Sequence, residues 1–136
     1  MEPRPDGVFD CIDYPRIKNL CVLDLSGKNI TKIINIPRNI LSLNLQNNEL
    51  KEIPDINHSL IELNLSANKI TKIGSLPPIS TLNMESNKIA KIENLPNTLS
   101  IINLSHNKIA KIENLPFSLV HLFISYNPIK VLENIP

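Results

Sequence analysis

The ten residues NLSANKITKI at positions 64–73 return twice, as NMESNKIAKI at 83–92 and as NLSHNKIAKI at 103–112. One asparagine marks each copy, and its successive positions lie 20, 20, 19 and 20 residues apart. These positions are Asn48, Asn68, Asn87, Asn107 and Asn127. A tandem period of about 20 residues is typical of a solenoid, in which each unit stacks only on its neighbours.

The aligned copies share the pattern L-x-x-L-x-L-x-x-N-x-L, with Ile or Met in some of the leucine positions. They read ILSLNLQNNEL (40–50), LIELNLSANKI (60–70), ISTLNMESNKI (79–89), LSIINLSHNKI (99–109) and LVHLFISYNPI (119–129). This pattern resembles that of the leucine-rich repeat family. An earlier copy, LCVLDLSGKNI (20–30), keeps the apolar positions but has Lys28 in place of the asparagine. Terminal repeats of solenoids are often atypical in this way.

The apolar residues of each copy alternate with polar ones, which is the period of a strand that is buried on one face. Leu43 with Leu45 and Leu63 with Leu65 should therefore point inward, and the second apolar cluster of each copy, such as Ile70 with Ile73, should close over the same core. The family resemblance implies a right-handed superhelix with a parallel β-sheet on its concave side. Its convex side should be mostly extended or short-helical, which makes an α/β-type solenoid dominated by β-structure.

We expect residues 1–19 to form an N-terminal flank or cap, and residues 20–136 to form the repeat domain. Its six repeats are expected at 20–39, 40–59, 60–78, 79–98, 99–118 and 119–136. A proline near the end of most units keeps the back of each repeat extended, because proline fixes φ and lacks an N–H group. The segments LPNTL (95–99) and LPFSL (115–119) resemble the short repeats of secreted bacterial effectors, whereas NKIAKIENL (87–95 and 107–115) resembles the phosphatase-regulator class.

The charge balance argues against nucleic acid as a partner, since 14 basic and 13 acidic residues give a net charge of +1. A conspicuous column of lysines (Lys32, Lys72, Lys91 and Lys111) is expected to be a solvated flank, because acidic residues follow two of its members. The first 19 residues contain no apolar run that would suit a signal peptide or membrane span. We therefore expect no membrane association and a cytoplasmic location, in the producing cell or in a host cell.

Only two cysteines are present, Cys11 and Cys21. Two reduced thiols fit the expected compartment, and a disulfide between them is the alternative.

The sequence lacks the motifs that enzymes use for phosphate binding, metal binding or nucleophilic attack. His106 and His121 fall at opposite ends of neighbouring strands, too far apart to share a metal. We therefore predict no catalytic activity, no metal and no cofactor.

The asparagines of the repeat pattern are predicted to be structural, because each falls where the chain leaves a strand and its amide can bond to unpaired backbone groups. Binding should instead use the outward positions of the strands, where side chains are free of the core. Three outward columns follow from the alignment, and they run from Val22, Asp24 and Ser26 in the first repeat to His121, Phe123 and Ser125 in the last. The predicted partner-binding residues are Asn44, Glu62, Asn64, Asn83, Glu85, Asn103, His106, His121, Phe123 and Tyr126.

Each part of this surface has a second interpretation. The asparagine ladder can be a repeated soluble residue whose amides bond along the stack, and the aromatic residues of the last repeat can be a cap. The final repeat ends at Pro136, in register with Pro116, without a polar cap. A longer protein, a weak dimer through this edge and a self-capped monomer all fit.

The function predicted from these features is a protein-binding module that holds its partner on the concave face. The alternatives are the substrate-recognition part of a larger effector and a regulatory subunit of a phosphatase-like enzyme. The identity of the protein partner is not encoded in any motif.

Overall fold

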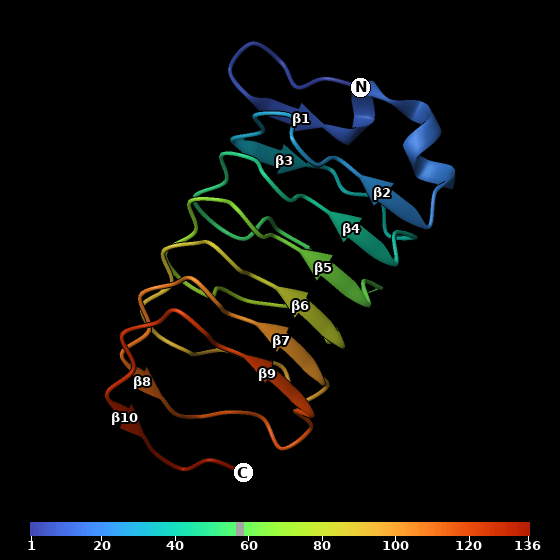
Figure 1. Cartoon of the computed structure of the whole chain (residues 1–136). Helices are drawn as coiled ribbons and strands as arrows, with labels where there is room; N and C mark the ends of the chain where they lie inside the picture. The colour runs from blue at the N-terminus through green and yellow to red at the C-terminus, as the bar shows by residue number, and fades with distance from the viewer. Residues whose placement is uncertain (57–58) are drawn as a thin grey trace.

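Six short parallel strands form one continuous sheet, in the order β2-β4-β5-β6-β7-β9. The structure is a computed structural model that describes residues 1–56 and 59–136. The strands of this sheet are β2 (Val22–Asp24), β4 (Ser42–Asn44), β5 (Glu62–Asn64), β6 (Thr81–Asn83), β7 (Ile101–Asn103) and β9 (His121–Phe123). Figure 1 shows them stacked in a single column, with the two chain ends at opposite ends of the stack. The predicted β-dominated solenoid is therefore confirmed.

The register of the sheet follows the repeat without a slip. Leu43 pairs with Leu63, Leu63 with Leu82 and Leu82 with Ile102, even though one repeat is a residue shorter than the others. The shorter repeat therefore loses its residue outside the strand. Because a slip by one residue would turn the apolar side chains to solvent, burial of one sheet face fixes this register.

Two more pairs of strands lie on the back of the solenoid, opposite the sheet (Figure 1). They are β1 (Val8–Asp10) with β3 (Lys32–Ile34), and β8 (Lys111–Ile112) with β10 (Val131–Leu132), and both pairs are parallel. In the described part of the chain, helix is confined to the 3-10 segments η1 (Cys11–Asp13) and η2 (Pro15–Asn19). None of the described helices is long and apolar enough to cross a lipid bilayer.

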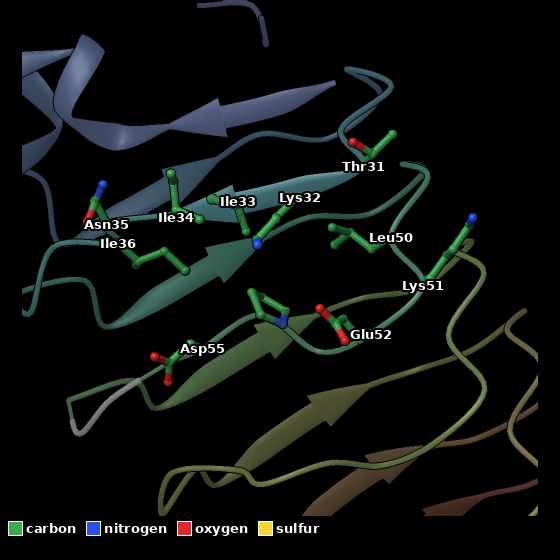
Figure 2. Close-up of a pocket in the computed structure, with 11 residues that line it drawn as sticks. Thr31, Lys32, Ile33, Ile34, Asn35, Ile36, Leu50, Lys51, Glu52 and Asp55 are labelled. Atoms are coloured by element: carbon green, nitrogen blue, oxygen red, sulfur yellow. The ribbon is translucent and has the colours of Figure 1, made fainter. Parts of the chain in front are cut away.

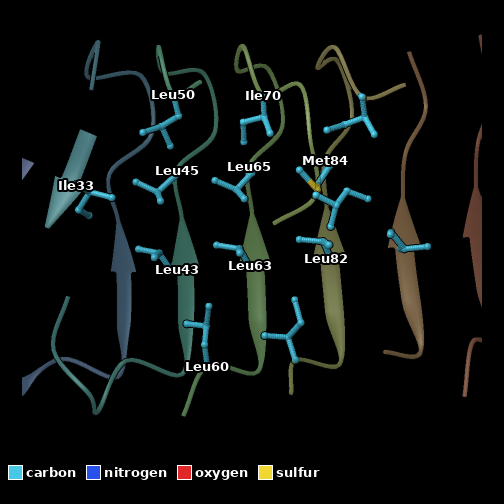
Figure 3. Packing of buried hydrophobic residues seen from close by; sticks show 14 of the residues in the cluster. Ile33, Leu43, Leu45, Leu50, Leu60, Leu63, Leu65, Ile70, Leu82 and Met84 are labelled. Carbon is cyan, nitrogen blue, oxygen red and sulfur yellow. The ribbon is translucent and has the colours of Figure 1, made fainter. Parts of the chain in front are cut away.

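The core consists of layers of aliphatic side chains, one layer from each repeat. Leu45, Leu65 and Leu104 are fully buried, and Ile70 and Ile73 from the back of their repeat are at most 1% exposed. Figure 3 shows the leucines of successive strands stacked beneath the sheet, with Leu50 and Ile70 closing the layer from the loop side. The predicted inward positions are confirmed.

The N-terminal flank takes part in this core. Phe9 is fully buried, Ile17 is 1% exposed, and β1 adds a parallel strand beside β3. The flank therefore has the back strand of a repeat but no strand in the six-stranded sheet. It covers the first layer of the core, which would otherwise face water.

The other end of the core is open. Leu119, Leu122, Ile124 and Ile129 of the last repeat are only partly buried, although they correspond to fully or almost fully buried residues in earlier repeats. In this structure they have neighbours on one side only.

Candidate functional site

The asparagine that ends each repeat pattern joins two neighbouring repeats through its side chain. In the buried Asn68, Oδ1 accepts a hydrogen bond from the backbone N–H of Leu50 at 3.0 Å. Its Nδ2 donates to the carbonyl oxygens of Leu45 at 2.9 Å and Leu65 at 3.1 Å. Asn48, Asn87 and Asn107 repeat this arrangement. These amides fill the hydrogen-bonding needs of buried turns and are not free to meet a ligand.

The residue before each of these asparagines has a left-handed backbone conformation. Asn47, Ala67, Ser86, His106 and Tyr126 have φ between 52° and 56°, and Gly27 occupies the same position in the first repeat with φ of 64°. Only glycine and, to a lesser degree, asparagine tolerate this region without strain. The turn therefore keeps its shape even where the sequence places Ala, Ser, His or Tyr there.

The second asparagine ladder, on the outward side of the sheet, also has a structural use. Asn44, Asn64, Asn83 and Asn103 each accept a hydrogen bond from the backbone N–H two residues later, at 3.0 to 3.1 Å. Asp24 does the same in the first repeat, and this bond from Ser26 is the largest cause of the lowered pKa of Asp24. Such side-chain turns end a strand. The ladder therefore fixes the exit of each strand.

This finding corrects part of the predicted surface. Ser66 and Ser105 were expected to point outward, but they are 5% and 8% exposed and lie inside these turns. The amides also bond along the stack at only a few points, such as Asn103 Nδ2 to Glu85 Oε2 at 3.0 Å. The ladder is mainly a set of turns within single repeats.

We use the name sheet face for the outward surface of the six-stranded sheet. It consists of the first and the last residue of each strand, together with the residue two positions after the end of that strand. A shallow hollow of about 330 Å³ lies near its centre, over β4, β5 and β6. The side chains around it are Ser42, Asn44, Glu62, Asn64, Thr81 and Asn83. Glu62 is the only charged residue among them, and its one described hydrogen bond is a long one, 3.3 Å from the hydroxyl of Ser42. Glu62 was predicted from the sequence as a partner-binding residue. The hollow beside it was not predicted, because it forms from side chains of three neighbouring repeats.

The aromatic candidates form two separate pairs in the last two repeats. His106 and Tyr126 stack with ring centroids 4.3 Å apart, because they occupy the same left-handed position in consecutive repeats. His121 and Phe123 lie on the same side of β9 with ring centroids 6.4 Å apart. Tyr126 is 78% exposed and Phe123 is 53% exposed. The apolar surface at this end is therefore available to a partner.

A larger hollow, of about 750 Å³, lies on the back between the first two repeats (Figure 2). It is lined by β3 on one side and by the segment from Leu50 to Asp55 on the other. Pro54, which is buried there, has no N–H group to donate to β3. Its lining mixes Lys32, Lys51, Glu52 and Asp55, so it has no single charge to select a ligand.

One member of the lysine column, Lys111, is paired with acidic residues, and so is Lys69 outside the column. Lys111 contacts Glu113 and Glu133, each at 2.8 Å, and Lys69 pairs with Glu49. The hydrogen bonds from Lys111 to these two carboxylates raise its pKa to about 12. These pairs agree with the expectation of a solvated flank.

Both cysteines are free thiols. Cys11 is buried beside Asp10, and burial, with a smaller effect of the Asp10 charge, raises the pKa of its thiol to about 11. Cys21 is exposed. Within the described residues, no three His, Cys, Asp or Glu side chains come close enough to hold a metal ion.

Comparison with known proteins agrees with this architecture. A family model described as "Leucine Rich repeat" matches residues 57–74. The structure is similar to that of a Shigella effector LRR domain, with a TM-score of 0.77 and 29% identity over 93% of this chain. It is also similar to YopM from Yersinia enterocolitica WA-314, with a TM-score of 0.69 and 28% identity over 88% of this chain.

The chain thus has the architecture of a leucine-rich repeat solenoid, and its similarity is to the bacterial effector type. It spans 55% of the Shigella domain and 31% of YopM. The search of curated proteins gave no match.

Proposed function

We propose that this chain is a protein-binding module that holds its partner on the sheet face, which the family resemblance implies to be concave. The observation that carries the proposal is the strict register of six parallel strands, which aligns eighteen positions in three columns, all of them outward except the buried Ser66 and Ser105. Most of these side chains are not needed by the core. A surface of this kind can vary without loss of the fold, which is how solenoids recognise partners.

The area of the sheet face limits the affinity. Six strands at about 4.8 Å spacing, with about 16 Å of outward residues along each strand, cover roughly 400 Å². A standard interface buries about 800 Å² on each partner. We therefore expect the exposed Phe123 and Tyr126, and the loops beside them, to contribute to the contact.

A larger assembly is the second candidate. Both similar structures come from bacterial effectors, and this chain spans little more than half of one of them. On this reading the chain selects the substrate for activity located elsewhere in a longer protein. The phosphatase-regulator alternative gains no support from these two structures.

The free thiols Cys11 and Cys21 and the effector similarity support a cytoplasmic site of action, in the producing cell or in a host.

The test is retention of a partner from cell lysate by two matched pairs of variants. Thr81→Arg and Ile101→Arg place a large charge on the sheet face, while Ala90→Arg and Ala110→Arg place it on exposed positions of the back. None of these four positions belongs to the asparagine turns, so all four variants should fold, as circular dichroism can verify. Loss of one protein band with the first pair but not the second supports the proposal. Equal retention by all four variants contradicts it.

A further inference from the structure

Charge is distributed unevenly between the sheet face and the rest of the molecule. The eighteen positions of the three columns include three carboxylates, Asp24, Glu62 and Glu85, and none of the fourteen lysines and arginines. The whole chain has a formal charge of +1, so the remaining surface carries +4. The one surface proposed to bind a partner is thus acidic on a slightly basic molecule.

The three carboxylates are spread along the sheet. From the strand register, Glu62 lies roughly 12 Å from Asp24 and roughly 14 Å from Glu85, allowing about 4.8 Å for each strand and 3.3 Å for each residue. This separation is too large for a shared metal ion, in agreement with the absence of a metal-sized cluster from the described residues. It suits several separate cationic side chains along one partner.

Glu62 differs from the other two in how little of its bonding capacity is used. Asp24 accepts from the backbone N–H of Ser26, and Glu85 accepts from the amide of Asn103 at 3.0 Å. Glu62 has only the 3.3 Å contact with Ser42, and none of the described cations forms a salt bridge with it. A carboxylate has about four acceptor positions, so most of those on Glu62 remain open.

The surroundings of Glu62 suit a long cationic side chain. The hollow beside it holds about 330 Å³ and is walled by the hydroxyls of Ser42 and Thr81 and by the amides of Asn44, Asn64 and Asn83. Outside the lining of the hollow, the residues directly before β4 and β5 are apolar and exposed, with Leu41 40% and Ile61 48% exposed. Lysine and arginine bury their methylene stems against such apolar groups while the charged head meets a carboxylate.

We propose that the partner is a basic segment, and that one of its arginine or lysine side chains enters the hollow over β4, β5 and β6 with Glu62 as its counter-ion. Asp24 and Glu85 receive further cationic groups on either side. This inference rests on the proposed function, because it names the chemistry of the partner for the same surface.

The direct test is titration of the ¹⁵N-labelled chain with three heptapeptides of the form X-Ser-Gly-X-Ser-Gly-X with blocked ends, where X is Arg, Gln or Glu. The Arg peptide should shift the backbone amides of Ser42, Glu62, Asn64 and Thr81 in the NMR spectrum, while the Gln and Glu peptides should not. Glu62→Gln should weaken binding of the Arg peptide by about 2- to 5-fold, since it removes one exposed charge pair. The matched control is Glu52→Gln, which removes an exposed carboxylate from the back of the solenoid. This substitution should leave the affinity for the Arg peptide unchanged. The inference is overturned if the Gln peptide shifts the same amides, if no amide moves, or if Glu62→Gln and Glu52→Gln act alike.

Retention of a partner by Thr81→Arg and by a charge-reversed variant, Glu62→Lys, separates this inference from the proposed function. If Thr81→Arg abolishes retention of a partner from lysate but Glu62→Lys does not, the sheet face binds a partner that is not basic there. The inference then fails while the function stands. If neither substitution changes retention, the sheet face is not the binding surface and both fail. Loss of retention with both supports both.

Discussion

At the scale of single residues, the asparagine that ends each repeat pattern links two neighbouring repeats through the hydrogen bonds of its side chain. Asn68 satisfies one backbone N–H and several carbonyl groups, drawn from its own repeat and the one before. Buried backbone groups of this kind have no water to replace the lost partner. The repeat keeps this asparagine because no other side chain of the same size offers a donor and an acceptor there.

We predict that Asn68→Ala lowers the free energy of unfolding by about 3 kcal/mol, because it leaves buried polar groups without partners. Asn127→Ala removes the same set of bonds in the last repeat, where the residue is only partly buried. Water can replace those bonds, so the cost there should be about 1 kcal/mol. Urea unfolding followed by circular dichroism measures both values. Equal losses at the two positions would contradict this account.

The buried thiol of Cys11 makes stability depend on pH in the alkaline range. Its pKa is raised from 9.0 to about 11 in the folded protein. The unfolded chain therefore releases this proton at lower pH than the folded one, and the stabilising contribution is complete below pH 9 and is lost as pH rises to about 11. Its size is at most about 2 to 3 kcal/mol.

We predict that Cys11→Ala flattens the fall in stability between pH 9 and pH 11 that the unchanged chain shows. In the native protein near neutral pH, a thiol reagent should modify the exposed Cys21 quickly and Cys11 only on unfolding. Mass spectrometry of the modified chain separates the two sites. Equal rates of modification would contradict the burial of Cys11.

Much of the residue-level structure could be predicted from the sequence, because the alternation of apolar and polar positions names inward residues such as Leu63 and Leu65 directly. The burial of Ser66 and Ser105 could not be predicted in the same way. It depends on the turn that Asn64 and Asn103 make with the backbone two residues later. The spacing N-x-S after a strand is the pattern that would have indicated this turn.

At the scale of elements, the N-terminal flank acts as half a repeat. It contributes β1 to the back and Phe9 to the core, but no strand to the sheet. The sequence predicted a flank or cap at 1–19 without showing how it would fold, because the repeat pattern describes the front strand that this segment lacks. The apolar spacing in VFDCIDYP, which parallels KIINIP at 32–37, is the remaining clue. The division into a flank and a repeat domain from residue 20 stays a prediction.

We predict that Phe9→Ala destabilises the protein by about 3 to 5 kcal/mol, since it opens a cavity over the first core layer. The matched control is Ile12→Ala, at a position that is 69% exposed, which should change stability by less than about 0.5 kcal/mol. Thermal or urea unfolding of the two variants gives the comparison. A small effect of Phe9→Ala would mean that the flank only rests on the repeats.

At the scale of the whole molecule, the solenoid has a closed end and an open end. Each repeat contacts mainly its neighbours, so local stability depends on the layers on both sides. The first layer is covered by the flank, whereas the last layer is only partly buried. Stability should therefore fall towards the last repeat of this chain.

We predict a matching gradient in amide hydrogen exchange. The N–H of Leu65 bonds to the carbonyl of Asn83 in the middle of the sheet, and the N–H of Leu104 bonds to Phe123 in the last strand. The Leu104 amide should exchange at least about tenfold faster, because the last repeat opens without the rest. Uniform exchange along the sheet would show that the molecule unfolds only as one unit.

The distribution of charge and the central hollow belong to this scale, and they are the least predictable from sequence. The repeat pattern places Glu62 and Glu85 on outward positions, but the hollow over β4, β5 and β6 arises from side chains of three repeats acting together. Prediction was strongest where one repeat determines the outcome and weakest where several do.

The measurement that tests the account most directly is photo-crosslinking in cell lysate with p-benzoylphenylalanine placed at single positions. Thr81 and Ile101 report on the sheet face, and Ala90 and Ala110 report on the back of the same two repeats. We expect one defined protein adduct from positions 81 and 101 and none from positions 90 and 110. An adduct formed only from the back positions would contradict the claim that this solenoid binds its partner on the sheet face.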